Sequence, residues 1–273
     1  MEKAGEIKFE HISFGKKLKS MLSVDFRRMF TTPLFYILAG IAVVIPILVL
    51  VMTTSVGGSA SVDPATGVET VAEMEPITNT WQVVESISGE SAGMSSDIMS
   101  MCNINLLFFM AAVFVCIFVA DDFRSGYAKN LFAVRSKKTD YVISKSLVGF
   151  AGGACMILAY FIGAVIGGAI AGLSFDAGAA GIGGIVMCLL SKVFLMGVFV
   201  PIYVLMSVVG KQKLWLSMIG SLAVGLLLFM MVPSMTPLDS TIMNVILCLA
   251  GGVLFSVGLG AVSTIVLKKT SLV

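Results

Sequence analysis

Residues 104–145 read INLLFFMAAVFVCIFVADDFRSGYAKNLFAVRSKKTDYVISK, an apolar run that stops at two aspartates and is followed by a basic segment. A helix needs about 20 predominantly apolar residues to cross the hydrocarbon core of a bilayer, and the run Ile104–Ala120 is close to that length. The charged segment 121–145 cannot enter the hydrocarbon at low cost. The stretch therefore predicts a membrane span followed by a polar loop.

Five other apolar runs have the same character. The chain has 273 residues, of which 58% are hydrophobic and only 12% charged, a composition that excludes a water-soluble domain. We predict an all-α polytopic membrane protein with six transmembrane helices. The predicted spans are Leu34–Thr53, Ile104–Ala120, Leu147–Gly172, Gly183–Val209, Leu214–Val232 and Ile242–Leu267.

The positive residues alternate along the chain. All but one of the 18 Lys and Arg residues lie in the amino-terminal segment, in every second loop after it, or in the carboxyl-terminal tail. Positive residues near span ends stay on the cytoplasmic side, so both termini are expected in the cytoplasm. This predicts a cytoplasmic segment 1–33 and a transmembrane domain 34–273, with an external loop 54–103 and a cytoplasmic loop 121–145.

The segment Ser13–Phe30 has the spacing of an amphipathic helix, with apolar and cationic residues on opposite faces. Such a helix lies in the membrane interface, either as an anchor or as a surface that also contacts a cytoplasmic partner. Asp25 falls on its apolar side. We expect Asp25 to pair with Arg28, three residues on, or with a cation of the loop 121–145.

Lys192 is the one cation predicted inside a span, where an unpaired charge is costly. It either positions its helix or lines a water-filled substrate path, unless the span boundary is misplaced. Its expected partners are Asp176, Asp239 or helix carbonyls. Since the spans contain no acid by this reading, a proton relay lacks its usual groups, which argues against an ion-coupled secondary transporter.

Glycines and small residues recur every four positions in the third and last predicted spans. Such faces let helices approach closely, either inside one subunit or between subunits. The small residues are Gly149 and Gly153; Ala159, Gly163, Gly167 and Ala171; and Gly252, Ser256 and Gly260.

Several chemistries are not expected in this chain. It has one His and no Cys-x-x-Cys pair, so neither a metal site nor a catalytic site is predicted. It has no G-x-x-x-x-G-K-[ST] loop to bind a nucleotide phosphate. The external loop 54–103 is acidic, with Asp63, Glu69, Glu73, Glu75, Glu85, Glu90 and Asp97 and no Lys or Arg. No nucleic-acid partner is expected.

The order of residues in the loop 121–145 resembles the cytoplasmic segment of type 2 ABC transporter permeases. The pattern there is an acid, a Gly, a Lys or Thr, a Leu, a basic residue, an aromatic and a closing Lys. Its members here are Asp122, Arg124, Gly126, Lys129, Leu131, Arg135, Tyr141 and Lys145. Many permeases have a proline near the basic residue, whereas this chain has Val134-Arg135-Ser136. The six spans, the interfacial helix and the long first external loop are also similar to that family.

This resemblance implies that the chain is the permease subunit of an exporter in a bacterial plasma membrane and is not itself an enzyme. The loop would dock on a separate ATPase subunit that binds ATP and Mg, and the permease would pair with a second copy or a similar permease. The docking residues it implies are Asp122, Phe123, Arg124, Gly126, Tyr127, Lys129, Leu131, Phe132, Arg135, Tyr141 and Lys145. Peptides or hydrophobic compounds suit such a path. A non-transporting scaffold or peptide-immunity protein is the alternative.

Overall fold

The structure is a computed structural model that describes residues 14–55, 59–62, 69–72, 77–85, 103–134, 138–178, 181–211 and 213–269. Within these ranges the helices are α1 (Phe14–Thr31), α2 (Pro33–Ser55), α4 (Leu106–Arg124), α5 (Tyr127–Val134), α6 (Thr139–Ala171), α7 (Gly181–Gly210), α8 (Leu214–Phe229), α9 (Val232–Met235) and α10 (Ile242–Lys269), with a 3-10 turn η1 (Thr80–Val83). Strands β1 (Ser59–Val62) and β2 (Glu69–Ala72) form an antiparallel hairpin that pairs Ser59 with Ala72.

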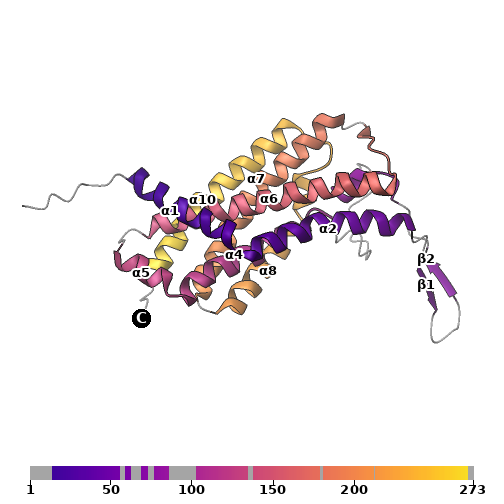
Figure 1. Ribbon diagram of the computed structural model, residues 1–273. Helices are drawn as coiled ribbons and strands as arrows, with labels where there is room; N and C mark the ends of the chain where they lie inside the picture. Colours follow the sequence, from indigo (N-terminus) through magenta and orange to yellow (C-terminus); the bar gives the residue numbers. More distant parts are fainter. Residues whose placement is uncertain are drawn as a thin grey trace, which may run out of the picture.

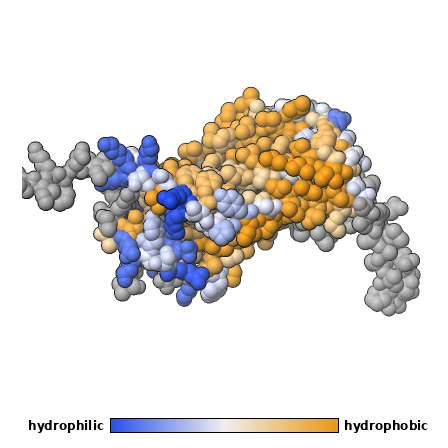
Figure 2. All heavy atoms as spheres, in the orientation of Figure 1, coloured by the Kyte–Doolittle hydropathy of each residue, from blue (hydrophilic) through white to orange (hydrophobic). Residues whose placement is uncertain are grey.

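The long helices lie side by side in an elongated bundle, with α1 and α5 at one end and the hairpin at the other (Figure 1). Apolar side chains cover the middle of the visible face, and hydrophilic ones gather at the α1 and α5 end (Figure 2). Within the described ranges, five helices are long and apolar enough to cross a membrane: α2, α4, α6, α7 and α10. The protein is therefore a multi-pass membrane protein.

The fifth predicted span, Leu214–Val232, is shorter than expected. The apolar helix α8 ends at Phe229, and a turn at Met230 and Met231 separates it from α9. Its 16 residues measure about 24 Å, against the roughly 30 Å of a hydrocarbon core.

Helices α4 and α6 extend into the charged loop 121–145 from both sides. Helix α4 continues to Arg124, and α6 already begins at Thr139, so both extend beyond the predicted span ends. The sequence places Asp122 and Lys145 in a polar loop outside the spans, because an unpaired charge is costly in a span. In the structure several of these charges are buried and paired, as described below. Gly126, with φ 75°, provides the left-handed turn between α4 and α5.

The repeated small residues lie between helices of this chain. A Cβ at Gly163 would collide with the carbonyl oxygen of Val43 in α2, and one at Gly167 would lie 2.8 Å from the Cα of Ile47. Helices α2 and α6 therefore touch through their backbones. Gly252 of α10 makes a similar close approach to α7, at 3.0 Å from the carbonyl oxygen of Phe194. At Gly163, Gly167 and Gly252 the small residues therefore pack helices within one subunit, one of the two roles expected for them.

Most of the predicted external loop 54–103 lies outside the described residues. The described parts are mainly the hairpin and residues 77–85. The second half of that segment, from Thr80 to Glu85, is largely buried against the helices.

Candidate functional site

Five side chains at the α5 end of the bundle form an α1–α4–α6 ion cluster: Asp25, Arg28, Asp122, Tyr141 and Lys145. The Lys145 ammonium lies 2.8 Å from Asp25 Oδ1 and 2.7 Å from Asp122 Oδ2. Arg28 Nη1 donates to Asp122 Oδ1 and lies 3.8 Å from Asp25. The Tyr141 hydroxyl donates to Asp122 Oδ2 at 2.9 Å. Two carboxylates and two cations thus balance each other inside the protein.

Burial makes this arrangement depend on complete pairing. Asp25, Asp122 and Lys145 are at most 1% exposed, and breaking one partner would leave an uncompensated charge. The ring of Phe118 covers Lys145, with 4.1 Å between Nζ and the ring centroid. Burial lowers the pKa of Arg28, but the carboxylates of Asp122 and Asp25 outweigh that effect and raise the pKa above its ordinary value. Arg28 therefore stays charged.

Asp25 contacts both of its expected partners, since Arg28 and the loop cation Lys145 each lie beside it. Ser144 of α6 adds a hydrogen bond to Asp25 Oδ2 at 2.6 Å. The buried residues of α1 are Met21, Asp25 and Met29. Helix α1 thus packs its predicted lipid-facing side partly against α6, because the buried carboxylate needs the cation of that helix.

The residues implied as docking groups divide into two sets. Asp122, Phe123, Tyr141 and Lys145 are buried against other helices of this chain. The exposed set comprises Arg124 and Lys129, with Gly126, Tyr127, Leu131 and Phe132 partly exposed around them. Arg135 lies outside the described residues.

Helix α5 is attached to this cluster by aromatic contacts. The Tyr127 ring lies under the Arg28 guanidinium, at 4.7 Å from its centroid, and the Phe132 ring meets Tyr141 edge to face at 5.2 Å. Buried Phe123 makes a similar edge contact with Tyr141 at 6.3 Å. The helix therefore rests on the groups that connect α1, α4 and α6.

A second buried polar group, the Lys192 cluster, comprises Lys192, Glu85, Asn105 and Thr236. The Lys192 ammonium donates to Glu85 Oε2 at 2.7 Å, to Asn105 Oδ1 at 2.8 Å and to Thr236 Oγ1 at 2.9 Å. Asn105 Nδ2 also donates to Glu85 Oε2, at 3.1 Å. Every member is at most 4% exposed. The cluster connects α7 to Asn105 just before α4, to Thr236 at the end of α9 and to Glu85 after η1.

These partners correct the expectation for Lys192. Asp176 and Asp239 are exposed, and the actual counter-ion is Glu85, which we had assigned to the external loop. No acid is predicted within the spans, but Glu85 enters the bundle from the loop and supplies one beside Lys192. Lys192 is about 16 Å along α7 from the start of that helix, so the pair lies well inside the bundle.

Segment 77–85 reaches Lys192 because its own ends are well fixed. The Asn79 side chain and Gln82 form a capping box around η1. The Trp81 ring stacks on Phe161 with 5.6 Å between centroids, and its Nε1 donates to the Phe175 carbonyl at 3.1 Å. The spacing Asn79-x-x-Gln82 is a signal in the sequence for the turn itself, but not for its insertion among the helices.

Comparison of the chain with protein-family models, with curated proteins and with solved structures finds no match. The resemblance of residues 121–145 therefore stays an expectation. Among the described residues, no group of three or more His, Cys, Asp or Glu side chains is placed to hold a metal ion.

Proposed function

We propose that this chain is the membrane subunit of an ATP-driven exporter of the type 2 ABC class, with six crossings and cytoplasmic termini. The observation that carries the proposal is the α1–α4–α6 ion cluster at the base of the segment 121–145. It lies directly beneath α5, the short helix that would meet the ATPase.

The cluster makes the segment a stiff connection between a cytoplasmic partner and the spans. Asp122 is in the last turns of α4 and Lys145 in the second turn of α6, and both are paired with α1. A push on α5 would therefore move α4 and α6 as packed bodies instead of bending a loop. Shifts of packed helices are a common way to convert a local contact into a larger transition.

In this proposal the residues of the segment have two roles. Arg124 and Lys129 are exposed and contact the ATPase subunit, which would hold ATP and Mg. Asp122, Tyr141 and Lys145 instead position α5 through their buried contacts. A second permease copy, or a similar permease, would complete the path for peptides or hydrophobic compounds.

The contacts of α8 support a sixth crossing. Cys116, in the middle of α4, accepts or donates a hydrogen bond with Ser221 of α8, and Phe229 at the end of α8 packs against Phe109 near the start of α4. Helix α8 thus runs antiparallel to α4, away from the α5 end. Helix α10 returns to the α5 end, where Lys138 donates to the Leu267 carbonyl at 2.6 Å.

The test is an affinity purification of tagged protein from its native membrane, with mass spectrometry of what is recovered. A Lys129→Glu variant reverses an exposed charge on α5. A Lys213→Glu variant does the same at an exposed lysine before α8, and serves as the matched control. We expect the native protein and the control to recover an ATPase with a Walker loop, and Lys129→Glu to recover several-fold less.

Two outcomes would oppose the proposal. Recovery of no ATPase under gentle detergent would favour the scaffold or peptide-immunity alternative. Export that continues without ATP but stops when the proton gradient is collapsed would favour a secondary transporter, for which the buried Lys192–Glu85 pair supplies an acid and a base.

A further inference from the structure

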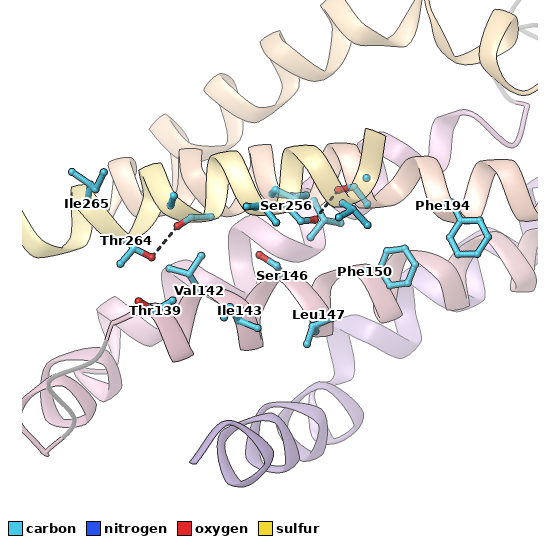
Figure 3. A pocket seen from close by; sticks show the side chains of 18 of the residues that line it. Thr139, Val142, Ile143, Ser146, Leu147, Phe150, Phe194, Ser256, Thr264 and Ile265 are labelled. Carbon is cyan, nitrogen blue, oxygen red and sulfur yellow. Dashed lines mark hydrogen bonds between the residues drawn. The ribbon is translucent and has the colours of Figure 1, made fainter. Parts of the chain in front are cut away.

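A groove of about 820 Å³ runs between α6 and α10, with α7 as its floor. Figure 3 shows side chains of α6 and α10 facing each other across it. Its walls are mainly apolar, with Val142, Ile143 and Phe150 on α6 and Val253 and Val257 on α10. The two valines of α10 are 57% and 70% exposed, so this α6–α10 groove opens on the side that meets lipid.

The length of the groove along the helices is close to the thickness of the hydrocarbon in one membrane leaflet. It begins at Thr139 and Lys268, at the α5 end, and reaches inward to Phe150, Phe194 and Leu249. From Thr139 to Phe150 the helix rises about 17 Å, and half of a hydrocarbon core is about 15 Å. An extended acyl chain entering from the α5 end would therefore fit along it.

Two polar side chains of α10 that line the groove are hydrogen-bonded to backbone carbonyls. Ser256 Oγ donates to the Gly197 carbonyl at 3.3 Å, and Thr264 Oγ1 donates to the Gly260 carbonyl at 2.9 Å (Figure 3). These bonds leave the interior suited to hydrocarbon.

The charge is at the rim. Of the described residues that line the groove, Lys268 alone is charged, and within the described part of the chain it has no ion-pair partner. Its neighbour Lys269 is equally exposed but does not line the groove. A cation at the mouth of an apolar slot between spans is complementary to an anionic lipid headgroup.

We propose that the α6–α10 groove binds an anionic phospholipid of the leaflet at the α5 end. One acyl chain lies along the apolar walls, and the phosphate is paired with the Lys268 ammonium. A second copy of this chain fits less well. A symmetric dimer in a membrane would bring the two Lys268 side chains to the same depth of one interface, where like charges repel. The proposal does not depend on transport or on an ATPase.

The test uses the full chain in phosphatidylcholine vesicles that contain a small fraction of photoactivatable phosphatidylglycerol. Parallel vesicles contain photoactivatable phosphatidylcholine with the same acyl chains. After illumination, labelled peptides are mapped by mass spectrometry. We expect phosphatidylglycerol to label α6 and α10 groove residues about five-fold more than phosphatidylcholine does, the preference that one lysine near an anionic surface supplies.

Two pairs of variants locate the headgroup and the chain. Lys268→Gln should remove the preference for phosphatidylglycerol, whereas Lys269→Gln should retain it. Gly260→Phe places a ring in the groove, where a Cβ at that position has ordinary contact with Val142 at 3.9 Å. It should lower labelling by both lipids several-fold. Gly258→Phe adds the same ring where no atom lies within 4 Å of the added Cβ, and should change nothing.

Equal labelling of the native groove by the two lipids would overturn the proposal. So would equal effects of Lys268→Gln and Lys269→Gln, which would indicate a diffuse surface attraction. Crosslinks between two copies at groove residues, in place of lipid, would show that the groove is a subunit interface.

Discussion

Lys192 remains a buried cation because each of its three ammonium protons has an oxygen acceptor. Glu85 supplies the opposite charge, and Asn105 and Thr236 accept the other two hydrogen bonds. Removing one member of a buried ion pair costs about 3–5 kcal/mol, because the other charge is left without a partner. Replacing both members at once avoids that cost.

A double-mutant cycle tests this dependence. We expect Lys192→Met and Glu85→Gln each to destabilise the folded protein by about 3 kcal/mol, and the double variant to lose clearly less than the sum. The measurement is the unfolding midpoint in a titration with denaturing detergent. Lys213→Met, at an exposed lysine, is the control and should leave the midpoint unchanged. Additive losses in the double variant would contradict the pairing.

In the ion cluster at the α5 end, the Lys145 ammonium lies between two carboxylates and offsets their mutual repulsion. Without its charge, Asp25 and Asp122 would face each other with only Arg28 between them. We expect Lys145→Gln to release α1 from α6, and hydrogen–deuterium exchange of α1 to become at least about ten-fold faster. Lys129→Gln, which removes an exposed charge on α5, should leave α1 protected. Unchanged exchange in Lys145→Gln would show that apolar contacts hold α1 in place.

At the scale of elements, α2 and α6 are joined by a contact that only glycine permits. Gly163 and Gly167 bring the two backbones together at the level of Pro46, which α2 accommodates inside the helix. Neighbouring helices allow such a proline within a span. In lipid this close packing replaces the hydrophobic effect as the attraction between helices.

A side chain at Gly163 should therefore separate the helices. The obstacle to a Cβ is the Val43 backbone, which cannot rotate away, so we expect Gly163→Leu to destabilise by about 1–3 kcal/mol or more. Gly40→Leu, in α2 at a site with no atom within 4 Å of the added Cβ, should be tolerated. Thermal denaturation of both variants in mild detergent distinguishes them. Equal behaviour of the two would mean that α2 does not pack closely on α6.

At the scale of the whole molecule, the number of crossings depends on α8 and α9. Five helices are long enough to span, whereas α8 has 16 residues, and five crossings would place the termini on opposite sides. We expect six crossings, since α8 runs back along α4 toward the end of the bundle that carries the hairpin.

Cysteine labelling with a membrane-impermeant maleimide tests this topology. The exposed positions Ser125→Cys, Lys213→Cys and Asp239→Cys each report one connection. We expect the first two to react only from the cytoplasmic side and Asp239→Cys only from outside. The described native cysteines are buried or half-buried, and the unsubstituted protein gives the background. Reaction of Lys213→Cys and Asp239→Cys from the same side would leave five crossings.

The multi-pass helical character was predictable from the sequence by itself, because apolar runs of span length and the placement of positive residues are local properties. The same holds for the amphipathic helix α1 and for the pairing of Asp25 with Arg28, three residues on. The helices continue past the predicted span ends where charges lie inside them, at Asp122 and Lys145. These two charges can be buried only because each has a partner on helix α1, more than 90 residues away in the sequence.

Only the tertiary structure decided the partner of Lys192 and which implied docking residues are exposed. Glu85 and Lys192 are 107 residues apart, and no local pattern places a turn of an acidic loop against the middle of a span. The α6–α10 groove likewise exists because α10 approaches α7 at Gly197 and Gly252 while leaving α6 apart. A span is determined by whether a segment is more stable in lipid or in water, which is a property of that segment alone. Buried ion pairs and grooves are determined by which helices pack next to each other.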